Sequence, residues 1–85
     1  MTIRVANVPA RAVDVLITEL EKHGVKFAMV NAYRGAAMSE AGTALFSWED
    51  EVLTVTVTRN EGHFSERMLR GGLKQLVGEA VEGLQ

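Results

Sequence analysis

The feature that most constrains the fold is an alternation of apolar and hydroxyl side chains in Glu51–Arg59. The segment reads Glu-Val-Leu-Thr-Val-Thr-Val-Thr-Arg, so leucine and valine alternate with threonine. A period of two residues places successive side chains on opposite faces of a β-strand. The segment therefore predicts a strand with one buried face, in a sheet that is covered on one side only.

Two other segments have the spacing of amphipathic helices. Apolar residues recur at i, i+3, i+4 and i+7 in Pro9–His23, and Gly24 follows as a left-handed C-terminal cap. Ser65 suits the N-cap of a second helix that runs nearly to the end of the chain, with Glu66 in its first turn. Each glycine inside a helix costs about 1 kcal/mol relative to alanine. We therefore expect either a break at Gly71-Gly72 or another backbone or ligand close to it.

The rest of the sheet is predicted from shorter patterns. Strands are expected over Thr2–Asn7, Val25–Tyr33 and Ala44–Trp48. Arg34–Gly42 is rich in glycine and alanine and lacks the bulk to anchor a core, so it predicts a loop or a single helical turn. The polar residues 49–51 are few enough for a tight hairpin into the threonine-rich strand.

These elements predict an α+β fold. The expected architecture is a two-layer sandwich in the order β-α-β-β-β-α, with a four-stranded, mostly antiparallel sheet and both helices on one face. The length of 85 residues suits one domain, so residues 1–85 are expected to form a single α+β domain. Strand order is left open by the sequence, and the first strand could even be exchanged with a second chain.

Composition narrows the setting and the chemistry. The chain has no cysteine, which excludes disulfides, zinc–thiolate sites and thiol catalysis and suits a reducing compartment. The N-terminus lacks the apolar core of a signal peptide, and no segment approaches the ~20 apolar residues of a membrane span. We therefore expect a cytoplasmic protein with no membrane partner.

The open sheet face predicts self-association. A domain of this size has a small core and gains stability from burial against a partner. On the expected alternation, the open face is less polar than a solvated surface, and its candidate interface residues are Val30, Leu45, Thr54 and Thr56. A homodimer through this face is the first hypothesis. The alternative is that Val30 and Leu45 are ordinary scattered apolar residues on a surface.

A second hypothesis places a ligand at one end of the sheet. Tyr33 and Trp48 lie at predicted strand ends, next to the flexible segment that contains Met38. Aromatic side chains with a polar group suit a pocket for a small apolar or aromatic molecule. The alternative is that these side chains fill the edge of the core and form local hydrogen bonds.

The second helix carries a basic group that could contact an anion. Arg67, Arg70 and Lys74 gather on the side opposite its apolar stripe. The net charge of −2 argues against a broad basic field, so nucleic acid is the less favoured partner for this group. Charged residues on a helix are more often a solvated face, and Glu66 is placed to pair with Arg70.

No residue pattern predicts catalysis. The polar candidates, which are His23, His63, Glu40, Ser39, Tyr33 and Asp50, show no spacing that pairs a nucleophile or acid with an orienting partner. The acidic residues 49–51 could bind a hard cation, but a turn is also where solvated carboxylates belong. The sequence thus favours a non-enzymatic binding or assembly module without a cofactor or metal.

Overall fold

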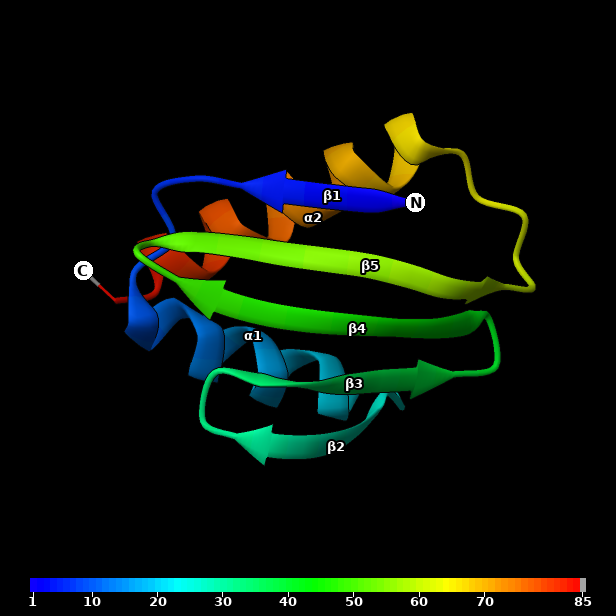
Figure 1. Ribbon diagram of the computed structural model, residues 1–85. Helices are drawn as coiled ribbons and strands as arrows, with labels where there is room; N and C mark the ends of the chain where they lie inside the picture. Colours follow the sequence, from blue (N-terminus) through cyan, green and yellow to red (C-terminus); the bar gives the residue numbers. More distant parts are fainter. Residues whose placement is uncertain (85) are drawn as a thin grey trace.

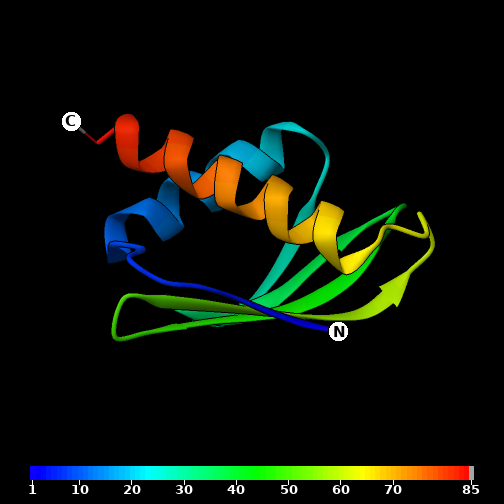
Figure 2. The same ribbon diagram turned by 90° about the horizontal axis from the view of Figure 1, so that it is seen from above.

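The computed structural model describes residues 1–84 and shows one sheet with two helices on the same face (Figures 1 and 2). The elements in chain order are β1 (Thr2–Val5), α1 (Ala10–Lys22), β2 (Lys26–Asn31), β3 (Arg34–Ser39), β4 (Gly42–Glu49), β5 (Val52–Asn60) and α2 (Glu66–Glu82). The strands lie in the order β1-β5-β4-β3-β2, and every neighbouring pair is antiparallel. The predicted α+β class, with two helices and an antiparallel sheet, is confirmed.

The helix ends follow the predicted capping residues. Gly24 has a φ of 91°, which is the left-handed conformation expected after α1. The Ser65 hydroxyl accepts a hydrogen bond from the Met68 amide at 3.1 Å, and this bond caps the first turn of α2. α2 continues without a break through Gly71-Gly72.

The prediction of a four-stranded sheet is wrong, because most of the expected loop Arg34–Gly42 forms the additional strand β3. The order is therefore β-α-β-β-β-β-α. A Cβ atom at Gly35 would lie 2.7 Å from the carbonyl oxygen of Ala28 on β2, so the two strands approach closely only because residue 35 is glycine. On the other side Gly35 pairs with Phe46 of β4, which supplies the bulk that β3 lacks.

Two hairpins determine where the strands end. The expected strand Val25–Tyr33 stops at Asn31, whose side-chain oxygen accepts a hydrogen bond from the Tyr33 amide at 2.8 Å. Tyr33 therefore lies in the turn between β2 and β3. β4 and β5 are joined by Asp50 and Glu51, with φ values of 49° and 64°. Positive φ at both central residues is typical of the type I′ turn that favours tight hairpins.

The fully buried core lies between the helices and the β1–β5 side of the sheet. α2 contacts both α1 and β1 there. The buried apolar residues come from β1, β5, both helices and the segment before α1: Ile3, Val5, Val8, Ala12, Val13, Leu16, Leu53, Val77 and Ala80. None comes from β2, β3 or β4, where the apolar side chains on the helix-covered face stay partly exposed. The two halves of the sheet are thus unequally covered.

Candidate functional site

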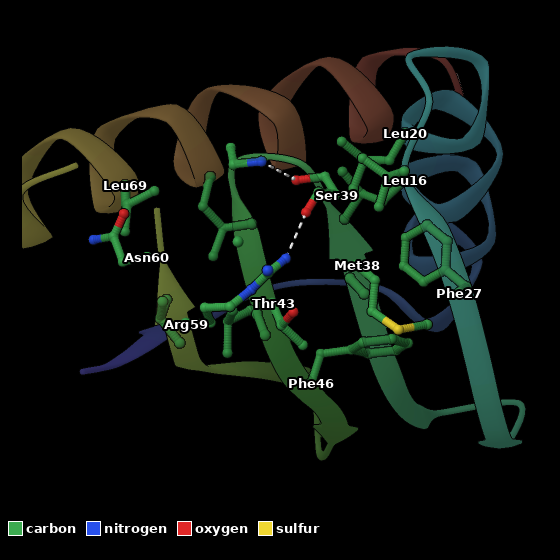
Figure 3. A pocket seen from close by; sticks show the side chains of 18 of the residues that line it. Leu16, Leu20, Phe27, Met38, Ser39, Thr43, Phe46, Arg59, Asn60 and Leu69 are labelled. Carbon is green, nitrogen blue, oxygen red and sulfur yellow. Dashed lines mark hydrogen bonds between the residues drawn. The ribbon is translucent and has the colours of Figure 1, made fainter. Parts of the chain in front are cut away.

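A cavity of about 310 Å³ lies where the helices leave the sheet incompletely covered (Figure 3). Its walls come from α1, from β2 to β5 with their connections, and from the N-terminal half of α2. The lining residues are Val13, Leu16, Ile17, Leu20, Val25, Phe27, Ala37, Met38, Ser39, Ala41, Gly42, Thr43, Ala44, Phe46, Leu53, Val55, Val57, Arg59, Asn60, Phe64, Leu69 and Leu73. Most of these side chains are apolar.

The cavity follows from how α2 distributes its apolar residues. Val77 and Ala80, in the C-terminal half of the helix, are buried in the core. Leu69 and Leu73 lie one to two turns earlier, are only partly buried, and line the cavity. The same helix therefore closes the core with one half and forms a cavity wall with the other.

The cavity floor combines aromatic and small side chains. Phe27 and Phe46 meet edge to face, with ring centroids 5.8 Å apart and planes at 82°. Ala37 pairs with Ala44 across β3 and β4, and both line the cavity. Because these two alanines have no side-chain atoms beyond Cβ, the floor is recessed between larger neighbours.

Polar groups are confined to the end of the cavity near the β3–β4 turn. The Arg59 guanidinium reaches toward Ser39 and donates a hydrogen bond to its backbone carbonyl at 2.9 Å (Figure 3). Asn60 fixes the connection to α2, because its amide group donates to the Phe64 carbonyl at 2.7 Å and accepts from the Phe64 amide at 3.0 Å. This end is a polar, hydrogen-bonded rim around an otherwise apolar space.

The aromatic pair predicted from the sequence does come together, but outside the cavity. The rings of Tyr33 and Trp48 have centroids 5.0 Å apart and planes inclined at 37°. The Trp48 indole donates to the Val8 carbonyl at 2.6 Å and so holds the segment that leads into α1. Met38 lies at the far end of β3 from Tyr33 and lines the cavity instead. A ligand at the Tyr33–Trp48 end stays a prediction.

The predicted basic group lies on the exposed side of α2. Arg67, Arg70 and Lys74 are all exposed, and Arg70 pairs with Glu66 at 3.3 Å, as its position one turn later predicts. An exposed pair of this kind contributes little to stability. Anion binding by this group stays a prediction.

The predicted interface residues lie on or beside the uncovered sheet face. Leu45 pairs with Thr56 on that face and is 51 % exposed. Val30, at an irregularity in the edge strand β2, is 78 % exposed. Thr54 and Thr56 are half-buried between neighbouring strands.

Sequence patterns do not distinguish the cavity-lining residues from core residues. Leu20, Phe27 and Leu69 fall on the apolar faces of their elements, where the pattern predicts burial. Arg59 ends the threonine-rich strand and carries no signal of a role at the cavity. Only the spatial arrangement shows that these four residues surround the same space.

Neither helix in residues 1–84 is long and apolar enough to cross a membrane. Over the same residues, no three or more histidine, aspartate or glutamate side chains gather as they would to hold a metal ion. Comparisons of the chain with protein-family models, with curated proteins and with solved structures gave no match.

Proposed function

We propose that this protein is a non-enzymatic binding module that holds a small apolar molecule in the cavity between its helices and its sheet. The observation that carries the proposal is a space of about 310 Å³ with predominantly apolar walls that the described side chains leave unfilled. Ligand pockets typically measure ~300–1,000 Å³ and combine apolar walls with a few polar groups. This cavity lies at the small end of that range.

The energetics favour an apolar occupant. Phe27, Phe46 and Leu73 line the cavity and are only partly buried by the chain itself. Removing apolar surface from water contributes about 25 cal/mol per Å², so a molecule that covers these side chains gains free energy from both its own surface and theirs. The polar rim at Arg59 and Asn60 would then orient the molecule.

Filling the cavity floor should abolish binding without unfolding the protein. We expect 1-octanol to raise the melting temperature of the wild type in a thermal-shift titration, because a ligand that binds only the folded state stabilises it. In the Ala37→Leu variant the new side chain would occupy the floor, and the octanol-dependent shift should disappear. The Ala37→Leu protein alone should be about as stable as the wild type, because the added carbons enter open space.

The matched control is Ala36→Leu, the same substitution one position earlier on β3. Ala36 pairs with Leu45 and does not line the cavity. Its variant should respond to octanol as the wild type does. Absence of a shift in the wild type, or an equal shift in the Ala37→Leu variant, would refute binding in this cavity.

A second candidate function, homodimerisation through the open sheet face, is favoured by a separate observation. One row of paired residues crosses the whole face from β2 to β1, consisting of Ala28, Ala36, Leu45, Thr56 and Thr2. Small side chains around an exposed leucine place no charged group in the row, so a second copy could pack against it. Burial there would add stability that a single small core does not supply.

The dimer is tested by placing a charge in the middle of this row. Light scattering should give the mass of a dimer for the wild type and of a folded monomer for Leu45→Glu, since the interface would bury an unpaired carboxylate. Met68→Glu is the control, because Met68 is 61 % exposed on α2, away from the open face. A monomeric wild type at high micromolar concentration would contradict the dimer.

A further inference from the structure

We infer that the molecule bound in the cavity is an apolar monocarboxylate whose carboxylate group is held by Arg59. This inference rests on the proposed binding function and adds the chemical class of the ligand. Its starting point is that Arg59 is the only charged residue among those that line the cavity in residues 1–84.

The guanidinium group of Arg59 has N–H donors that are not used in hydrogen bonds to the described residues. It donates one hydrogen bond, from Nη2 to the Ser39 carbonyl. Within residues 1–84, no carboxylate lies within the 4.0 Å of an ion pair with Arg59, although Glu40 and Glu61 are close to the cavity end in sequence. Arginine carries five N–H donors in a planar fork that matches the two oxygens of a carboxylate. The structure thus leaves a cationic fork without an anionic partner at the rim of an apolar space.

The position of Arg59 is fixed by its strand and by its hydrogen bond. β5 carries the residue, and the bond to Ser39 draws the side chain across β4 to the end of β3 (Figure 3). Gly42 pairs with Ser39 on one side and with Asn60 on the other. A Cβ atom at Gly42 would collide with the Arg59 carbonyl oxygen, so the absence of a side chain at residue 42 lets the Arg59 backbone lie close to this end of β4. A side chain that is already anchored loses less entropy when it binds a ligand.

One guanidinium with one free fork favours a carboxylate over a phosphate ester. One guanidinium neutralises the single charge of a carboxylate, whereas a phosphate monoester carries nearly two negative charges at neutral pH and would keep one of them unbalanced beside the apolar space. The cavity leads away from Arg59 between Leu16, Leu20 and Phe27 (Figure 3). A ligand with a carboxylate at one end and a hydrocarbon or aromatic body would therefore match both regions at once.

The test compares two probes that differ only at the head group, octanoate and 1-octanol, by calorimetric titration at low salt. The Arg59→Gln variant should bind octanoate about tenfold more weakly than the wild type, the usual size of a lost charge-assisted hydrogen bond. Its affinity for 1-octanol should stay within twofold. The octanoate affinity of Arg59→Lys, which keeps the charge but not the planar fork of donors, should lie between those of the wild type and Arg59→Gln. Arg67→Gln removes an exposed arginine that does not line the cavity, so it should behave as the wild type. Octanoate affinity should also weaken with added salt while that of octanol does not.

The outcomes separate this inference from the proposed function. Binding of 1-octanol without octanoate, or equal octanoate affinity in the wild type and the Arg59→Gln variant, would overturn the role of Arg59 while the apolar cavity remained a binding site. Failure of both probes to bind the wild type would overturn the proposed function and the inference together.

Discussion

The Ile3→Ala variant should be less stable than the wild type by about 3 kcal/mol in chemical denaturation. Ile3 is 1 % exposed and belongs to the cluster that joins β1, β5 and both helices. Removing buried carbons sacrifices their transfer free energy and leaves a cavity that rigid neighbours cannot fully close, so substitutions of this kind cost 2–5 kcal/mol. For a domain of this size, such a loss is a large part of the total stability.

A matched pair of substitutions tests whether the two halves of the sheet are packed as unequally as the structure indicates. Val5 is 6 % exposed in β1, whereas Val57 of β5 is only partly buried and lines the cavity. Val5→Ala should cost about 2 kcal/mol, but Val57→Ala about 1 kcal/mol or less, because Val57 has fewer neighbours to lose. Equal losses would mean that the cavity is closed in solution.

Replacing Gly71, Gly72 and Gly78 together with alanine should stabilise the protein by about 2–3 kcal/mol. Each glycine is exposed within α2, and beyond the local helix backbone no described atom stands within 4 Å of the Cβ that alanine would add. Alanine restricts the unfolded chain and favours the helix by about 1 kcal/mol per position. The melting temperature should rise by roughly 10 °C or more.

Gly35→Ala is the control for this set, because it makes the same change where there is no room. A Cβ atom at Gly35 would press on the backbone of β2, so this variant should be destabilised. If the triple alanine variant proved less stable than the wild type, or lost an association that the wild type shows, a second backbone must pack on α2. That result would support the expectation from the sequence that another backbone lies close to these glycines.

Much of the fold is predictable from local patterns because the two helices and most of the strands obey them. The alternation around Val55 produces a strand with one covered face. The stripe around Leu16 produces a helix that buries Val13 and Leu16, while Ile17 and Leu20 stay partly exposed and line the cavity. Gly24 and Ser65 end and begin helices through backbone conformation and a side-chain hydrogen bond. Both effects act within a few residues and need no tertiary context.

β3 could not be predicted from its own residues, because the contacts that stabilise it as a strand come from β2 and β4 on either side. Gly35 and Ala36 have low strand propensity and little to bury. They form a strand because the backbone of β2 packs so close to residue 35 that only glycine fits there, and because Phe46 of β4 lies opposite Gly35. Tertiary context of this kind outweighs intrinsic propensity and is not visible in a window of sequence.

The cavity escapes prediction for a related reason. The pattern shows that Leu69 and Phe27 belong on the apolar faces of a helix and a strand. It does not show that a space remains between these two faces. Whether two apolar surfaces touch depends on how the helices lie over the sheet, which is set by the packing of Val77, Ala80 and Ile3 at the other end. A search for binding residues among polar motifs therefore overlooks a site made mainly of apolar side chains.

The position of β1 at the edge beside β5 has a consequence for folding during synthesis. β2 to β5 form a meander of consecutive hairpins, whereas Ile3 pairs with Val55 and Val5 with Leu53. β1 is synthesised before the other elements of this fold, so it cannot pair until β5, the last strand, has been made. Contacts between segments so distant in sequence form slowly, because a long loop must close before they stabilise it. Before β1 pairs with β5, the apolar face of the meander has no contact with Ile3. The nascent chain therefore cannot complete its core before β5 has emerged.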